Sequence, residues 1–337
     1  PVVWTEHIEL PQPGPDDKRA DLERLTDTLG YSPEVPLFWP RQLPVLVREK
    51  VFRLDLTLGK TTKGYKLLEI DRAGPLYAVA IDIGSTNIVG SLWDLGRLEK
   101  KYEDALKNPQ IVFGPDILSR MHLAMTGKLR DLCEALLGGI NELTVKLARG
   151  AGIEPGDMLY ASVCGNTVMT HFLLGLPVDN IPVEPYIPVV HKPGTLLAKE
   201  LGLGINPEAP VFVFPNAGSY VGGDIISGIV ATGIYNSEAP RVLIDIGTNG
   251  EVVIGTKEWI FVGSGAAGPA LEAGVLRAGM SAKEGAIYRV DLKGEKFHLK
   301  TIGDATAVGI CGSGVIDLVA ELYREGWIDP YGRFTEK

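Results

Sequence analysis

One short motif occurs twice in this chain and constrains its fold more than any other feature. The first copy is Asp82–Asn87 (DIGSTN) and the second is Asp245–Gly250 (DIGTNG). Apolar residues precede and follow both copies, so each predicts a buried strand, a tight turn and an antiparallel return strand. Because the two hairpins begin two similar successions of elements, the sequence predicts an internal duplication.

Both turns have the composition of anion-binding loops. Glycine lets the backbone approach a ligand closely, successive N–H groups point into such a bend, and hydroxyl side chains add donors. Asp82 and Asp245, at the strand ends, are candidate Mg²⁺ ligands and catalytic carboxylates. The alternative for each aspartate is to cap its own hairpin turn. The candidate phosphate-binding residues are Gly84, Ser85, Thr86, Asn87, Gly247, Thr248, Asn249 and Gly250.

From residue 76 onward, strands and helices alternate in the order of an α/β protein. Three strands precede a helix in each half, and the six strands are predicted at 77–84, 88–94, 97–103, 241–247, 251–255 and 258–262. Helical periodicity in the first half begins at Asp116 and ends at Gly150, with apolar positions at Leu129, Leu132, Leu136, Ile140, Leu143 and Leu147. Glycine-rich turns then open helices in the second half, where the helix dipole favours bound anions. The alternative for these glycines is close packing. The candidate ATP-binding residues in these turns are Gly265, Gly268, Gly312, Ser313 and Gly314.

The two DIG motifs resemble the two phosphate loops of the actin, heat-shock chaperone and sugar-kinase ATPase superfamily. Within that superfamily, several stretches are similar to the reductive activators of corrinoid proteins. The likeness runs from about Leu22 to Phe334 and therefore covers nearly the whole chain. The stretches that carry it are Asn108–Arg120, Gly165–His171, Asp245–Glu251, Ala266–Glu272 and Ile310–Gly314.

The resemblance implies a duplicated ribonuclease-H-like (actin-like ATPase) fold with an N-terminal linker segment. The second half is predicted to be incomplete, because no strand and helix follow the helix that ends near Glu325. In the superfamily that later helix holds the adenosine, so we expect this chain to be a fragment of a longer protein. The expected divisions are a linker with a short helix and hairpin at 1–75, a middle domain with the first loop at 76–155, and a partial C-terminal ATPase domain at 156–337, with the second loop at 244–251.

The resemblance also implies an activity, in which ATP binding and hydrolysis accompany one-electron reduction of an inactive cob(II)amide. Asp224, at the start of a helix, would act as the base that orients the attacking water, and its alternative is a helix-cap carboxylate. The implied cofactors are ATP and Mg²⁺. The implied partners are a low-potential electron donor and a corrinoid protein, either a corrinoid iron–sulfur protein or a corrinoid methyltransferase subunit.

Two other functions stay open from the sequence. One is a sugar or small-acid kinase of the same superfamily, in which Asp224 would deprotonate a substrate hydroxyl. The other is a nucleotide-gated binding module whose closure matters more than turnover. The sequence also leaves open whether the chain forms a homodimer.

The net charge and the cysteine content limit the partners, location and cofactors that the chain can have. The net charge of −9 and the lack of a basic run argue against a nucleic-acid partner. No apolar stretch approaches the roughly 18 residues of a membrane span, and no signal peptide is predicted, so a cytoplasmic location is expected. The three cysteines lie far apart and fit a reducing compartment. Since a 2Fe–2S cluster usually needs four thiolates, we expect the activators' cluster only in a domain absent from this chain.

Prolines predict irregular structure in three segments. Residues 1–15 are expected to be an extended linker, and the four prolines between Pro33 and Pro44 to prevent regular structure. Residues 175–209 are expected to be a long surface insertion. Cys164 and Cys311, each before a glycine turn, are expected to be inert thiols.

Overall fold

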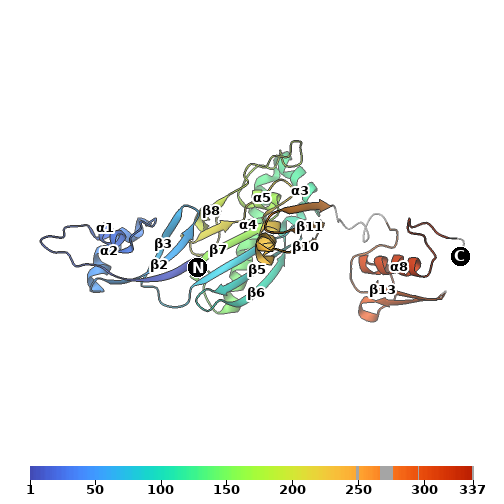
Figure 1. The fold of residues 1–337 in the computed structure, drawn as a ribbon, viewed down its shortest axis with the longest axis horizontal. Coiled ribbons are helices and arrows are strands. Elements are labelled where there is room, and N and C mark those ends of the chain that lie inside the picture. The colour runs from blue at the N-terminus through green and yellow to red at the C-terminus, as the bar shows by residue number, and fades with distance from the viewer. Residues whose placement is uncertain (248–249, 266–275, 295, 336–337) are drawn as a thin grey trace. The chain divides into compact units, whose positions relative to one another are not determined.

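The computed structural model describes residues 1–247, 250–265, 276–294 and 296–335. It divides into two compact units (Figure 1). The first unit comprises residues 1–244 and 252–264, and the second comprises residues 245–251 and 265–337.

The N-terminal segment is a three-stranded antiparallel sheet with two helices beside it (Figure 1). Leu25, Leu43 and Val47 of the helices pack with Leu56 and Leu58 of the sheet in one buried cluster. The hairpin predicted in this segment is confirmed. The elements are β1 (Val3–Glu9), α1 (Asp21–Leu29), α2 (Phe38–Glu49), β2 (Arg53–Thr61) and β3 (Gly64–Ile70).

Two expectations for this segment are wrong. Residues 1–15 are not simply extended linker, because β1 pairs with β2 from Val3↔Gly59 to Glu9↔Arg53. The prolines also do not prevent helix formation, because α2 contains both Pro40 and Pro44. Pro40 lies in the first turn, where the backbone amides have no intrahelical partner to lose. Pro44 has no N–H group, so the helix loses one backbone hydrogen bond there. Burial of the apolar face of α2 offsets the free-energy cost of that loss.

A six-stranded sheet forms the centre of the first unit, in the order β6-β5-β4-β7-β9-β8. The first three strands form an antiparallel meander, β7 and β9 are parallel to β4 in direction, and β8 is an antiparallel edge strand. The strand β8 lies inside the segment that was expected to be an irregular insertion. The strands are β4 (Tyr77–Ile83), β5 (Asn87–Asp94), β6 (Glu99–Lys107), β7 (Met158–Gly165), β8 (Gly194–Leu197) and β9 (Pro210–Val213).

The long helix α4 covers one face of this sheet with the predicted apolar stripe. Leu132, Leu136, Ile140, Leu143 and Leu147 are all fully buried in the same core as the strands. The predicted helical run is interrupted at Thr126 and Gly127, where the backbone leaves helical geometry. The helices of this region are η1 (Pro109–Val112), α3 (Ile117–Leu123), η2 (Ala124–Lys128), α4 (Leu129–Ala151), η3 (Pro155–Asp157), α5 (Thr167–Leu173) and α6 (Ala198–Leu201).

The expected domain boundary between residues 155 and 156 falls within the part of the chain that forms the six-stranded sheet. Strand β7, which follows it, pairs along its length with β4, which precedes it. The sheet is therefore continuous across that point.

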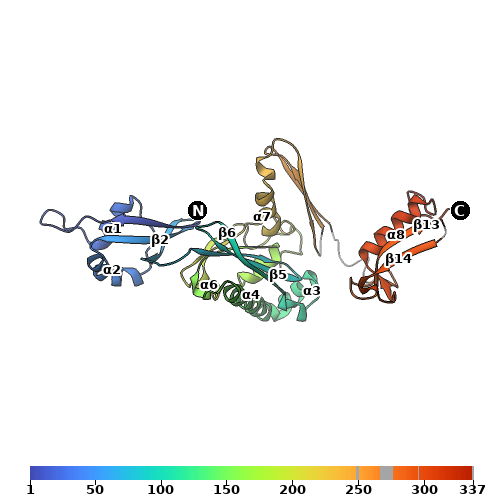
Figure 2. The same ribbon diagram turned by 90° about the horizontal axis from the view of Figure 1, so that it is seen from below.

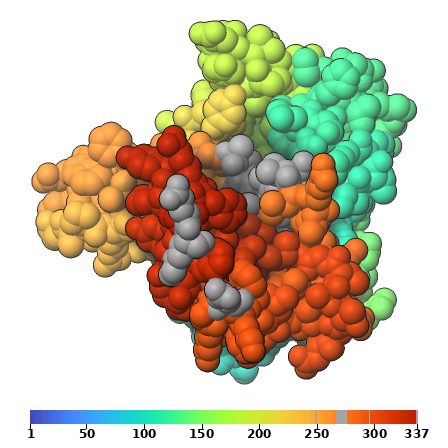
Figure 3. Space-filling view, turned by 90° about the vertical axis from the view of Figure 1, so that its right-hand side faces the viewer, coloured from blue at the N-terminus to red at the C-terminus, as the bar shows by residue number. Residues whose placement is uncertain are grey.

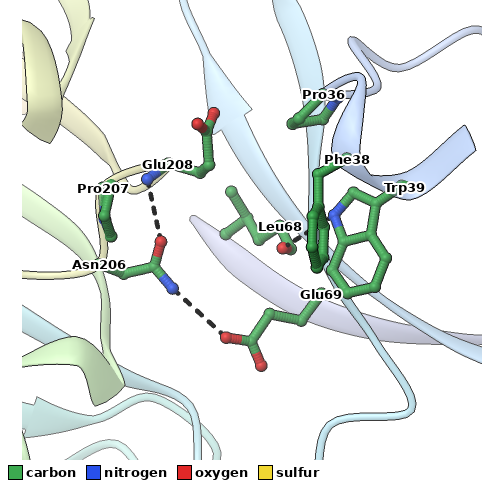
Figure 4. A pocket seen from close by; sticks show the side chains of 8 residues that line it. All are labelled: Pro36, Phe38, Trp39, Leu68, Glu69, Asn206, Pro207 and Glu208. Carbon is green, nitrogen blue, oxygen red and sulfur yellow. Dashed lines mark hydrogen bonds between the residues drawn. The ribbon is translucent and has the colours of Figure 1, made fainter. Parts of the chain in front are cut away.

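The linker sheet is fixed to the middle sheet by polar contacts around a cavity of about 470 Å³ (Figure 4). Asn206 Nδ2 donates to Glu69 Oε1 at 3.3 Å. The ammonium of Lys66, 1% exposed, lies 2.6 Å from Glu34 Oε1 and 3.1 Å from Glu208 Oε2. Apolar side chains line the linker side of the cavity: Pro36, Phe38, Trp39 and Leu68.

Helix α7 (Gly223–Thr232) follows β9 and packs against strands of the next sheet (Figure 2). Its Ile225 and Ile229 are buried with Val253, and Leu243 and Val262 pack against them. This sheet has the order β10-β11-β12. Its elements, with the short helix before it, are η4 (Ile234–Asn236), β10 (Arg241–Ile246), β11 (Gly250–Gly255) and β12 (Ile260–Gly265).

The strand that carries Asp245 differs from its counterpart in the first half. We expected both motif strands to be buried, yet in β10 Ile244 and Ile246 are 59% and 85% exposed. The reason lies in strand pairing. In the first half β7 pairs with the far side of β4, whereas β10 is an edge strand in its sheet.

The rest of the second unit is a small sheet, in the order β14-β13-β15, with α8 packed on β13. Figure 3 faces the surface of this part, coloured orange to dark red. Glu321 of α8 accepts a hydrogen bond from the amide of Leu292 at 2.8 Å. In the described ranges no helix combines the length and apolarity needed to cross a membrane. The elements are β13 (Ala286–Lys293), β14 (Lys296–Thr301), η5 (Ile302–Asp304), β15 (Gly309–Ile310) and α8 (Gly312–Arg324).

Candidate functional site

The first DIG motif forms the turn between β4 and β5. The last paired residues are Ile83 and Ile88, which leaves residues 84–87 to reverse the chain. A Cβ atom on Gly84 would lie 2.5 Å from the carbonyl oxygen of Asn87, a separation that real side chains do not tolerate. Only glycine therefore fits this turn, and the tight backbone is the kind that gathers amide N–H groups around an anion.

Asp82 lies on the face of β4 opposite the core. Its neighbours Ile81 and Ile83 are buried in the cluster that contains α4, whereas Asp82 is exposed. In the parallel ladder Asp82 is level with Cys164 of β7. The Cys164 thiol donates to Asp82 Oδ1 across 3.6 Å. The carboxylate and the thiol therefore meet where the two central strands end.

Asp224 reaches the same place from the start of α7. A Cβ atom on Gly222 would lie 2.4 Å from Cα of Asn166, so the absence of a side chain lets the start of α7 approach the end of β7. Burial, together with the negative charges of Asp82 and Asp224, raises the pKa of Cys164 to about 12. A hydrogen bond with Ser227 opposes that shift. The thiol is therefore neutral at ordinary pH, as expected for an inert cysteine, and both candidate carboxylates act on it.

The alternative role of Asp224, as a helix-cap carboxylate, fits the structure only in part. The N-cap residue of α7 is Gly222, and Asp224 lies two positions further into the helix. Its Oδ1 accepts a hydrogen bond from the backbone N–H of Ile225 at 2.8 Å. The carboxylate is thus held in the first turn, where the helix dipole stabilises negative charge.

The structure gives less detail for the second motif. Asp245 is exposed on β10, and Gly247 and Gly250 flank the turn. Thr248, Asn249 and Gly268 lie outside the described residues, and Gly265 ends β12. Asp82 and Asp224 belong to the first compact unit and Asp245 to the second.

For the glycines in the first turn of α8, the geometry fits the packing alternative more closely than the ligand-binding one. A Cβ atom on Gly314 would lie 2.3 Å from the carbonyl oxygen of Ile287 in β13. The hydroxyl of Ser313 donates to the carbonyl of Tyr288 at 3.1 Å. Gly314 is therefore needed for close contact between α8 and β13. Gly312 is the first residue of α8, and its contact with ATP stays a prediction.

Sequence reasoning assigned no role to Asn108 and Arg120, which both touch the first loop. Asn108 Nδ2 donates to the carbonyl of Gly84 at 2.9 Å, and Arg120 Nη1 donates to the carbonyl of Ser85 at 2.7 Å. They stand at the two ends of the stretch Asn108–Arg120, which carried part of the family resemblance. The pattern marked the segment as distinctive but gave no sign of which loop it would contact.

The donor set suits Mg²⁺ bound together with a phosphate ligand. Among the described residues there is no cluster of three or more histidine, cysteine, aspartate or glutamate side chains that could hold a metal. Mg²⁺ commonly uses one or two carboxylates and takes its other ligands from substrate phosphates and water. The exposed Asp82 carboxylate, at the end of a phosphate-type loop, meets that requirement.

Comparison with known families identifies the chain. Residues 1–74 match the model of the RACo linker region, residues 77–237 match the RACo middle region, and residues 239–337 match the C-terminal domain of RACo, the ASKHA domain. The chain belongs to the RACo family. Its first loop lies in the RACo middle region and its second in the ASKHA domain. The predicted family and the actin-like α/β fold are confirmed.

Individual relatives agree with this assignment. The chain is 34% identical over 268 residues to the corrinoid activation enzyme RamQ of Eubacterium limosum, covering 79% of this chain and 45% of that protein. It is 22% identical over 296 residues to the [Co(II) methylated amine-specific corrinoid protein] reductase of Methanosarcina barkeri, covering 76% and 52%. The chain thus spans about half the length of these RACo-like relatives.

A solved structure, a reductive activator for corrinoid, iron–sulfur protein, has the same fold as this RACo chain. It superposes with a TM-score of 0.81 at 37% identity, and the match covers 99% of this chain and 55% of that one.

Proposed function

We propose that this chain is the nucleotide-binding part of a reductive activator of corrinoid proteins. It would bind ATP with Mg²⁺ and couple ATP hydrolysis to one-electron reduction of cob(II)amide to cob(I)amide. The observation that carries the proposal is the convergence of Asp82, Cys164 and Asp224 beside a turn that only glycine fits. Membership of the RACo family supports the same reading.

Each group in this cluster has a distinct task in the proposed reaction. Phosphoryl transfer to water needs positioning and charge stabilisation more than covalent chemistry. The amides and hydroxyls of Ser85 and Thr86 would bind phosphate oxygens. Asp82 would hold Mg²⁺, which neutralises charge on the phosphates when it is bound. Asp224 would accept a hydrogen bond from the attacking water and remove its proton.

Cys164 keeps the cluster from gaining further negative charge. A thiolate beside Asp82 and Asp224 would repel both the carboxylates and the phosphates. Because the pKa of the thiol is raised to about 12, the group stays neutral. The second loop, with Asp245, Gly247 and Gly250, would contact the same nucleotide by analogy with the first.

The electron would come from outside the residues described. We propose that a 2Fe–2S centre or another low-potential donor delivers one electron per cob(II)amide, and that the acceptor is a corrinoid protein. Two relatives, a corrinoid activation enzyme and a reductase of a corrinoid protein, support this choice of partner.

One assay separates this proposal from the alternatives. The ATPase rate is measured alone, with a cob(II)amide corrinoid protein, and with a panel of sugars and small acids. Stimulation by the corrinoid protein, with cob(I)amide absorbance in the presence of a reduced iron–sulfur donor, is the expected result. Phosphorylation of a sugar or acid would instead establish a kinase, and ATP binding without turnover under every condition would establish a binding module.

A further inference from the structure

Three carbonyl groups of the first loop accept hydrogen bonds from one segment of the chain, residues 108–120. Gly84 O accepts from Asn108 Nδ2 at 2.9 Å, Ser85 O from Arg120 Nη1 at 2.7 Å, and Thr86 O from the backbone N–H of Asn108 at 2.8 Å. In a trans peptide the C=O of one residue and the N–H of the next point in opposite directions. Holding these carbonyls on one side therefore directs the amides of residues 85–87 to the other side.

We propose that Asn108 and Arg120 form a loop clamp that positions the amides of residues 85–87 for phosphate. The inference rests on the proposed function, since it assumes that this loop binds the nucleotide. Amides that already point to one side lose no orientation when the anion arrives, so the loop binds phosphate without first rearranging. Both are positioning residues, because neither is placed in contact with the ligand.

Arg120 is suited to this position by its charge as well as by its geometry. Its side chain is fully buried, and Nε donates to Gly114 O at 2.9 Å. Its Nη2 has no hydrogen-bond partner in the described part of the chain. The carboxylate of Asp116 acts on the guanidinium electrostatically, but within the described residues the two groups form no ion pair. A buried cation without a paired carboxylate is costly, and an anion bound on the other side of the loop would offset that cost.

Asn108 uses both halves of its amide. Oδ1 accepts from the backbone N–H of Gln110 at 3.0 Å and caps the short helix η1, while Nδ2 donates to the loop. An aspartate would preserve the cap and lose the donation. Gln110 Nε2 in turn donates to Leu132 O of α4 at 3.0 Å. The loop clamp is thereby anchored to the longest helix of the unit.

The structure provides a matched control for the loss of a buried arginine. Arg24, in the linker segment, is also fully buried, and it donates to backbone carbonyls of Pro11 and Arg19 at 3.0 Å each. Arg24 also pairs with the carboxylate of Asp17, so Arg24→Met removes a buried guanidinium together with an ion pair, whereas Arg120→Met removes a buried guanidinium that has no such pair. Only the second substitution removes a donor to the phosphate loop.

The test combines two measurements on the full chain. Titration calorimetry gives the affinity for Mg²⁺-ATP, and hydrogen–deuterium exchange without nucleotide follows the amides of the peptide that contains residues 84–88. Arg120→Met and Asn108→Asp should each weaken ATP binding at least ~10-fold, a typical effect of lost charged or buried hydrogen bonds. Both should also accelerate exchange in the loop. Arg120→Lys should recover part of the ATP affinity, because lysine restores the positive charge but not the forked guanidinium that donates to two carbonyls.

Each outcome decides the inference. Parental ATP affinity and parental loop exchange in Asn108→Asp and in Arg120→Lys would overturn the loop clamp, as would an equal loss of ATP affinity in Arg24→Met. A parental chain that does not bind ATP would count against the proposed function, and loop exchange in the variants would still decide whether Asn108 and Arg120 order the loop. If Arg120→Met unfolds, Asn108→Asp and Arg120→Lys carry the test.

Discussion

Asp82 and Cys164 lie level with each other on adjacent parallel strands, with the thiol 3.6 Å from the carboxylate. The pair places an acidic oxygen and a neutral sulfur at the strand ends, directly before the first loop and beside Asp224. The proposed chemistry depends on the carboxylate of this pair and not on the sulfur, and that division can be tested.

Asp82→Ala and Asp245→Ala should each reduce ATP hydrolysis at least ~100-fold, a size typical of lost charge stabilisation in the transition state. The reason is that each substitution removes a proposed Mg²⁺ ligand. Steady-state ATPase rates check it. Asp94→Asn is the control, since Asp94 lies at the other end of β5 and accepts from the amides of Gly96 and Arg97 in the turn between β5 and β6. An Asp82 variant with parental turnover would remove Asp82 from the site.

Asp224→Asn should abolish turnover while leaving ATP affinity and thermal stability nearly unchanged. The asparagine oxygen can still accept from the amide of Ile225, so the first turn of α7 keeps its hydrogen bond. What the substitution removes is the capacity to take a proton from water. Calorimetric titration and single-turnover kinetics separate the two properties. A parallel fall in stability and ATP binding would indicate that Asp224 serves the helix alone.

Gly84→Ala should weaken ATP binding at least ~10-fold, equivalent to about 1.4 kcal/mol. The new Cβ would lie 2.5 Å from Asn87 O, so the turn must open and its amides lose their alignment. Gly138→Ala is the matched control, because Gly138 lies in α4 with no atom near its Cβ position. That change should raise stability by about 0.5–1 kcal/mol without affecting ATP. Equal ATP affinities in the two variants would contradict the assigned role of the loop.

His171 should make the first unit less stable in acid. Burial lowers the pKa of this side chain, whose Nδ1 donates to Thr167 O and whose Nε2 accepts from Val189 N–H. The unfolded chain therefore binds the proton more readily, and stability present above the unfolded value of about 6.5 is lost as the pH falls through it.

Melting temperatures between pH 7.5 and 5 measure this effect. The fall should be smaller in His171→Gln than in the parental chain, and unchanged in His122→Gln, since His122 is exposed. A His171→Gln variant with the parental pH dependence would assign the acid sensitivity to other groups.

Local patterns predicted much of the fold because they depend on residues close in sequence. The apolar spacing of Leu132 to Leu147 and the hairpin at Gly84 fall into this class. Pairings between segments that are distant in sequence could not be predicted in this way. Strand β1 forms only because it pairs with β2, some fifty residues later in the chain. The prolines of α2 argued against a helix, but packing against the sheet stabilises one there. The same limit applies to the site. Motif and resemblance proposed Asp82 and Asp224 as site residues, whereas the contacts of Asn108 and Arg120 with the loop become visible only in three dimensions.

The polar contacts between linker and middle region also have a mechanical consequence. Besides the Lys66–Glu208 ion pair and the Asn206–Glu69 hydrogen bond, the amides of Thr62 and Thr195 each donate to the hydroxyl of the other, at 3.1 and 3.2 Å, and Arg72 Nη2 bonds Asp157 at 3.1 Å. These four attachments resist rotation about any single axis. A movement of the middle sheet, such as one that follows nucleotide binding at the proposed site, would therefore carry the linker sheet with it as one rigid body.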